Sequence, residues 1–117
     1  MGSPSVGDVI IIPFPFSDLS QSKRRPALVL AAVGKGDFLL SQITSKQYDD
    51  PHALPLKESD FLTGGIRIDS FIRASKLFTA NEALILGVAC HLTDSKLAEV
   101  IHHLIEMLSA CLEDATL

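Results

Sequence analysis

The feature that most constrains the fold is a series of short apolar segments, each ended by proline, glycine or polar residues. The first segment, "DVIIIPF", is rich in β-branched residues and lacks alternation, which is typical of a buried strand. Pro13 and Pro15 cannot donate ladder hydrogen bonds, so this strand must end near them or lie there at a sheet edge. The chain therefore begins like a small β-protein.

Further segments of similar length continue the pattern. "PALVLAAV" and "FLLSQITS" are joined by "GKGD", which predicts a tight hairpin, and Pro26 is expected to be the first residue of its strand. "LPLK" is at most a short edge strand, and "ESDFLTGG" predicts a turn region. "GIRIDSFIRASKLF" predicts one or two strands with Phe71 and Ala74 turned inward, and the latter half of "EALILGVACHL" predicts the last strand.

The end of the chain has helical periodicity instead. Thr93 or Asp94 can cap a helix over residues 94–112, whose apolar residues form one stripe, at positions 97, 100, 101, 104, 105, 108, 111 and 112. The sequence therefore predicts a mainly β fold of five to seven short strands, forming a small barrel with a C-terminal helix packed on it. Its 117 residues favour one domain, residues 1–117, with residues 1–6 flexible.

Composition and charge narrow the classes of function. No apolar run reaches membrane-spanning length and no signal peptide is visible, so we expect a cytoplasmic protein with Cys90 and Cys111 as buried, reduced thiols. The net charge of −4 argues against broad, non-specific binding of nucleic acid. Residues 1–76, however, carry nine Lys/Arg and eight Asp/Glu, whereas residues 77–117 carry one lysine and six acids. A local cationic patch on the first part is therefore compatible with the composition.

Two polar clusters at predicted strand ends are the candidates for chemistry: Lys23-Arg24-Arg25, and Ser41, Thr44, Ser45 and Lys46. Because the two strands are hairpin partners, Arg25 and Thr44 should be neighbours at one end of the sheet. An arginine beside a hydroxyl suits a phosphate group, although a solvated basic turn next to strand-ending hydroxyls is the plainer interpretation. The four histidines lack ligand spacing and no nucleotide-binding fingerprint is present, so no metal or cofactor is predicted.

Four stretches taken together resemble one known family. They are "GDVIIIPFPFSDLSQSKRRPALVL", "SQITSK", "GGIRIDSFIRASKLF" and "LTDSKLAEVIHHLIEML". In their order and spacing the chain resembles the PemK/MazF family of toxin endoribonucleases (mRNA interferases), specifically its PemK-like branch, over about residues 7–108. The resemblance implies an SH3-like or CcdB-like barrel with a C-terminal helix, a homodimer, and a cognate antitoxin that blocks the RNA groove with an extended acidic tail.

The resemblance also implies roles for individual residues. Arg25 and Thr44 correspond to the family's catalytic pair, which cleaves single-stranded RNA without a metal ion by attack of a 2′-hydroxyl on the adjacent phosphate, leaving a 2′,3′-cyclic phosphate. Arg73, in "DSFIRASKL", would lie near the RNA groove and the dimer surface. Physically, Arg25 suits the stabilisation of negative charge, because a guanidinium rarely gives up its proton. Thr44 can hold a phosphate oxygen or relay the 2′-hydroxyl proton.

The remaining candidates surround this pair. A base that titrates near neutral pH is missing from it, and the sequence offers only His52, in the loop after "ITSK", for that role. We expect phosphate or RNA contacts from Lys23, Arg24, Ser45 and Lys46, and stacking of a base on Tyr48.

Two departures from the family pattern and two alternative functions remain. The loop "DLSQSK" is short and lacks the glutamate that many members carry, and Phe71 stands where many have glutamine. A non-enzymatic gyrase inhibitor of the CcdB type is one alternative, but that family needs a C-terminal Trp-Gly-Ile and this chain has no tryptophan. The other alternative is an inactive relative that only binds an antitoxin.

Overall fold

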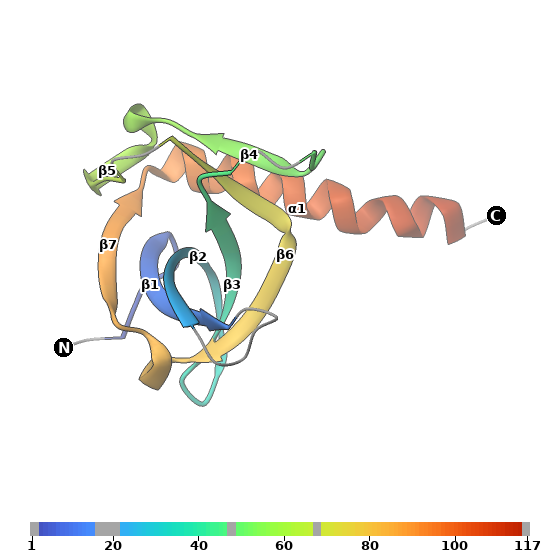
Figure 1. The fold of residues 1–117 in the computed structure, drawn as a ribbon. Helices are drawn as coiled ribbons and strands as arrows, with labels where there is room; N and C mark the ends of the chain where they lie inside the picture. Colours follow the sequence, from blue (N-terminus) through green and yellow to red (C-terminus); the bar gives the residue numbers. More distant parts are fainter. Residues whose placement is uncertain (1–2, 16–21, 47–48, 67–68, 116–117) are drawn as a thin grey trace.

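Strands with buried faces account for about half of the described residues in the computed structural model, which describes residues 3–15, 22–46, 49–66 and 69–115. Within these residues, seven strands form one curled sheet and a single long helix follows (Figure 1). The elements are β1 (Asp8–Pro15), β2 (Ser22–Gly34), β3 (Asp37–Thr44), β4 (Ala53–Leu56), the 3₁₀ turn η1 (Glu58–Asp60), β5 (Phe61–Gly64), β6 (Ser70–Asn81), the 3₁₀ turn η2 (Glu82–Leu84), β7 (Gly87–Leu92) and α1 (Asp94–Ala115).

The strand order is β4-β6-β3-β2-β1-β7-β5, and every neighbouring pair is antiparallel. This confirms the predicted mainly β fold with a C-terminal helix, and β4 is an edge strand as expected. The interpretation of "ESDFLTGG" as a turn region is wrong, because the segment contains η1 and then β5, which pairs with β7. Pairing supplied by β7, far along the chain, overrides the local turn signal.

The prolines mark where partner strands end. β1 pairs with β7 up to Ile11 but with β2 as far as Pro15, so Pro13 and Pro15 lie beyond the last β7 pair, as predicted. The prediction that β2 begins at Pro26 is wrong, because β2 begins at Ser22. The long β1 provides the reason, since it pairs with residues 22–25 and makes them extended backbone. The cationic residues therefore lie in a strand rather than in a loop.

The hairpin between β2 and β3 forms at the predicted "GKGD" turn. Gly34, Lys35 and Gly36 have φ values of 101°, 57° and 78°. Two glycines at positive φ make this tight, left-handed turn accessible at little steric cost. The turn sets the register of the two strands that carry the predicted site.

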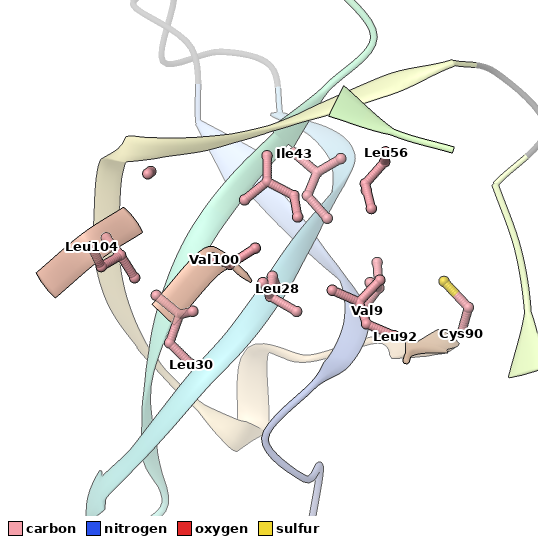
Figure 2. Close-up of a cluster of buried hydrophobic side chains, with 11 residues drawn as sticks. Val9, Leu28, Leu30, Ile43, Leu56, Cys90, Leu92, Val100 and Leu104 are labelled. Carbon is pink, nitrogen blue, oxygen red and sulfur yellow. The ribbon is translucent and has the colours of Figure 1, made fainter. Parts of the chain in front are cut away.

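One core cluster lies between the sheet and α1 (Figure 2). It joins side chains from six strands to Val100 and Leu104 of the helix, and its buried members are Val9, Leu28, Leu30, Ile43, Leu56, Ile72, Ala74, Cys90, Leu92, Val100 and Leu104. Ala74 is therefore buried as predicted, whereas Phe71 is only partly buried and belongs to neither core cluster, because side chains alternate along β6 and Ile72 takes the inward position.

A second cluster fills the opposite face of β1 and β2. Its buried members are Ile10, Ile12, Ala27, Val29, Phe38, Leu40 and Ala80, with Phe78 and Ile85 packed against them. Successive residues of β2, Leu28 and Val29, thus point into different clusters. Burial on both faces explains why the first two apolar runs of the sequence do not alternate with polar residues.

The helix begins over the sheet and ends away from it. Thr93 caps its N-terminus, because its Oγ1 accepts a hydrogen bond of 3.2 Å from the Lys96 backbone N. Figure 1 shows the C-terminal half of α1 extending past the strands, and there Ile105, Leu108 and Leu112 are 53%, 61% and 66% exposed. Only the first half of the predicted stripe serves the core. Within the described part of the chain, no helix combines the length and apolar character needed to cross a bilayer.

Candidate functional site

A hollow of about 390 Å³ lies where β2, β3 and β6 meet at one end of the sheet. Its wall consists of residues 23–26 of β2, residues 43–46 at the end of β3, Ile66, and Ser70 at the start of β6. We call it the cationic hollow, because the described residues that line it include Lys23, Arg24, Arg25 and Lys46 but no acid. Four cations on a wall whose described residues include no carboxylate suit the binding of an anion.

The two predicted catalytic residues lie on this same wall. β2 and β3 pair in constant register from Val29↔Leu40 to Ala27↔Gln42. Arg25 and Thr44 lie two residues beyond this last pair, one on each strand, and both line the hollow. Arg25 is half-buried with its Nε atom inaccessible to solvent, and Thr44 is 3% exposed. Buried stems restrict both side chains, so the hollow presents them in fixed positions.

The strand end orients the Thr44 hydroxyl. The backbone N of Lys46 donates a hydrogen bond of 3.2 Å to Thr44 Oγ1, which turns the chain and brings residues 45 and 46 onto the wall. A hydroxyl that accepts this bond keeps its own hydrogen for donation. The hollow therefore combines a guanidinium, a hydroxyl and flexible ammonium groups, which is a set of donors suited to a phosphate.

Four residues of the wall were not predicted from the sequence: Pro26 and Ile43, which adjoin the predicted residues, and Ile66 and Ser70, which lie farther along the chain. Ser70, 4% exposed, and Ile66 line the cationic hollow as well. Ser70 lies beside Thr44 because β3 pairs with β6 at Thr44↔Phe71. The pairing of β3 with β6 was the signal needed to find it, and nothing local in the sequence specifies that pairing.

The other predicted residues lie elsewhere. His52 does not line the hollow; its Nδ1 atom is 3.0 Å from Nε2 of His103 on α1. Arg73 is on the wall of no hollow described here, and its Nε atom donates to Asp50 Oδ2 at 3.0 Å. Tyr48 lies outside the described residues. The structure thus brings together Lys23, Arg24, Arg25, Thr44, Ser45 and Lys46, and separates His52 and Arg73 from them.

Asp50 anchors the segment that follows this end of β3. Its carboxylate accepts hydrogen bonds from the backbone N of His52 at 2.9 Å, from Arg73 and from Ser75 Oγ at 3.3 Å, and its side chain is only 7% exposed. The hydrogen bond from the His52 backbone, supported by Arg73 and Ser75, holds the Asp50 pKa below its usual value, although burial opposes this shift. The carboxylate therefore ties the segment to β6.

The described residues do not favour a cysteine nucleophile or a metal site. Burial, together with the charge of Asp8, raises the pKa of the Cys90 thiol to about 11, so this cysteine is not an activated nucleophile. No three His, Cys, Asp or Glu side chains of the described ranges gather as a metal site requires. The side chain of Cys111 lies outside the described part.

Comparison with known proteins points to one family. The model of the family described as PemK-like, MazF-like toxin of type II toxin–antitoxin systems matches residues 5–108. A search of curated proteins found no match.

Solved structures share the fold. A MazE–MazF structure from Deinococcus radiodurans is 21% identical, with a TM-score of 0.73, and the match covers 93% of this chain and 98% of that one. An endoribonuclease in complex with its cognate antitoxin, from a mycobacterial species, is 18% identical, with a TM-score of 0.67 and coverage of 93% and 96%. A mycobacterial endoribonuclease without antitoxin is 18% identical, with a TM-score of 0.67, and the match covers 93% of this chain and 94% of that one.

The anchoring role of Asp50 predicts that Asp50→Asn lowers the free energy of unfolding by an amount that depends on pH. Removing the charge should lower the free energy of unfolding by about 1–3 kcal/mol at pH 7, because buried donors lose their acceptor. Because the Asp50 pKa is lower in the folded protein than its usual value of 3.8, ionised Asp50 stabilises the fold at pH values above 3.8. This stabilisation is lost as the pH falls through the folded-state pKa. The difference from wild type in urea unfolding should therefore shrink from pH 7 to pH 2. The exposed neighbour variant Asp49→Asn is the control, and a difference independent of pH would contradict the assignment.

Proposed function

Because the chain belongs to the PemK-like, MazF-like toxin family of type II toxin–antitoxin systems, we propose that it is an endoribonuclease that cleaves single-stranded mRNA at selected sequences without a metal ion. The observation that carries the proposal is the position of Arg25 and Thr44 on one wall of the cationic hollow. A phosphate of the RNA backbone is the anion that this set of donors fits best.

Charge stabilisation is the main contribution of the hollow to the reaction. The 2′-oxygen of a ribose attacks the adjacent phosphorus, the bond from phosphorus to the 5′-oxygen breaks, and the products carry a 2′,3′-cyclic phosphate and a 5′-hydroxyl. Negative charge gathers on the non-bridging oxygens in the transition state. Arg25 donates to these oxygens and Thr44 fixes the phosphate orientation, and fixed donors of this kind contribute most when they need no rearrangement.

Proton transfer has no dedicated side chain on this wall. The described residues that line the cationic hollow include no imidazole and no carboxylate. The proton of the 2′-hydroxyl therefore passes to solvent, directly or through Thr44, and the 5′-oxygen takes a proton from water. In this mechanism His52 has a structural role with His103 rather than a role as general base.

The other cations hold the strand on either side of the reacting phosphate. The same hollow is lined by three exposed residues, Lys23, Arg24 and Lys46. Their flexible ammonium and guanidinium groups bind backbone phosphates without reading sequence. Ser45 adds a hydroxyl beside them.

Two surfaces support the expected partners. The exposed apolar side chains of the outer half of α1, Ile105, Leu108 and Leu112, favour a homodimer, because such a face is costly to leave in water. The cationic hollow favours a cognate antitoxin with an extended acidic segment, whose carboxylates would occupy the phosphate positions.

Cleavage tests the proposal directly. Wild type, incubated with mixed-sequence single-stranded RNA in the presence of a chelator, should produce 2′,3′-cyclic phosphate ends. Arg25→Ala should be slower by about 100-fold or more, because one preorganised donor contributes that much. Arg25→Lys should fall between them, since it keeps the charge but loses the planar fork.

Lys76→Ala is the matched control, because it removes one exposed charge of β6 away from the hollow. It should cleave like wild type. Equal inertness of wild type and Arg25→Ala would leave the inactive, antitoxin-binding relative as the better reading. A pH–rate profile of His52→Ala that loses an inflection seen in wild type would restore His52 as the base.

Association through α1 predicts that Leu108→Glu is monomeric. Sedimentation equilibrium should show a dimer for wild type and a monomer for this variant, because a charge cannot be buried unpaired in an apolar interface. Leu62→Glu changes an equally exposed leucine on β5 and should stay dimeric. A monomeric wild type would rule the dimer out.

Competition tests the antitoxin surface. A fluorescent single-stranded RNA bound to the protein should be displaced by an acidic peptide, because both occupy the cationic hollow. Arg24→Ala should weaken both ligands and lower the slope of log affinity for RNA against log salt by about 0.7. Displacement of RNA that is equally strong in Arg24→Ala and wild type would place the peptide elsewhere.

A further inference from the structure

A second hollow adjoins the first and has the opposite charge. It measures about 490 Å³, and we call it the acidic hollow because Glu58 and Asp69 lie on its wall. Leu56, Phe61 and Ile66 give the same wall an apolar part. A concave site that combines polar groups with an apolar contact surface can hold and orient a small ligand.

The two hollows share part of their wall. Ile66 and Ser70 line both of them. A ligand that fills the cationic hollow with a phosphate therefore has its next chemical group at the edge of the acidic hollow. In a single-stranded RNA that group is the sugar and base of the neighbouring nucleotide.

Two neighbouring glycines on the wall of the acidic hollow, Gly64 and Gly65, differ in the space that a side chain would have. Gly64 has a φ of +69°, and a Cβ there would lie 2.6 Å from the Ala89 carbonyl oxygen, so this position holds β5 close to β7. A Cβ on Gly65 would meet only Phe61 Cδ2, at 4.0 Å. Gly65 thus leaves open space on the wall that a larger side chain would fill.

The polar chemistry of the acidic hollow selects among bases. An ionised carboxylate accepts hydrogen bonds and donates none. Cytosine, adenine and guanine present an exocyclic amino group, whereas uracil presents carbonyl oxygens that a carboxylate repels. The same carboxylates repel phosphates, so the RNA backbone stays in the cationic hollow and only a base enters its neighbour.

We infer that the acidic hollow is a base-recognition subsite that takes an amino-bearing base next to the phosphate bound by Arg25, and discriminates against uracil through Asp69 and Glu58. Phe61, partly buried at the edge of β5, offers the base an aromatic contact. The inference rests on the proposed function, since it assumes that RNA occupies the cationic hollow.

Binding of uncleavable oligonucleotides tests the subsite separately from catalysis. The probes are 2′-fluoro oligonucleotides of cytosine alone or uracil alone, which lack the attacking hydroxyl. Wild type should bind the cytosine tract about tenfold more tightly, as expected for one set of specific base contacts. Asp69→Asn and Glu58→Gln should bring the ratio towards one, because an amide can donate as well as accept. Both positions are exposed, so these variants should fold.

Two further variants sharpen the result. Gly65→Leu adds a side chain to the wall of the acidic hollow, at a position where a Cβ meets only Phe61 Cδ2, and should reduce the preference for cytosine. Glu106→Gln makes the same chemical change as Glu58→Gln on an exposed position of α1 and should keep it.

The outcomes distinguish a failure of the base-recognition subsite from a failure of the proposed nuclease function. Equal binding of both tracts by wild type, or a preference that survives in Asp69→Asn, Glu58→Gln and Gly65→Leu, overturns the subsite and leaves the nuclease proposal standing. Failure to bind either tract overturns the proposed function and the subsite with it. Binding of an oligo-arginine peptide that depends on Asp69, without a base preference, assigns the hollow to a protein partner and overturns the inference.

Discussion

The pairing of β2 with β3 is the interaction on which the site depends. From Val29↔Leu40 to Ala27↔Gln42 the register is constant, and Arg25 and Thr44 lie two residues beyond its last pair on the two strands, on the wall of one hollow. A slip of one residue would turn one of the two side chains to the other face of the sheet. Burial opposes such a slip, because Leu28 and Val29 pack into two different core clusters. The proposed catalytic pair is therefore positioned by the packing of its apolar neighbours.

The length of β1 determines how the cations are presented. β1 continues to Pro15, past the end of its pairing with β7, and this extension gives residues 22–25 a partner. Of the three cations of β2, Arg25 is half-buried while Lys23 and Arg24 are exposed. The strand thus holds the guanidinium of Arg25 closer to the core than the charges of Lys23 and Arg24.

The sequence was sufficient wherever a signal was local. The hairpin turn, the β1 prolines and the capped helix follow from backbone chemistry at the residues themselves, and the neighbourhood of Arg25 and Thr44 follows from the hairpin. Features that depend on distant pairing were not accessible in this way. β5 needs β7, Ser70 reaches the hollow only through β3–β6 pairing, and His52 meets His103 from 51 positions away. Phe71 was assigned to the core by its apolar character, although the phase of β6 places Ile72 there instead.

The distribution of charge constrains how an RNA would be recognised. The one lysine of the C-terminal third, Lys96, is 6% exposed and lies 3.6 Å from Asp60 and 3.2 Å from Glu99, so it serves the anchoring of α1 rather than the surface. Glu82, Asp94, Glu99 and Glu106 are exposed on the same third of the chain and repel phosphates there. Among the described residues, the cationic hollow gathers four cations, which would neutralise only a few phosphates. So small an electrostatic contribution would give weak binding to any RNA, and under the proposed function differences among RNAs would come from contacts with bases rather than with the backbone.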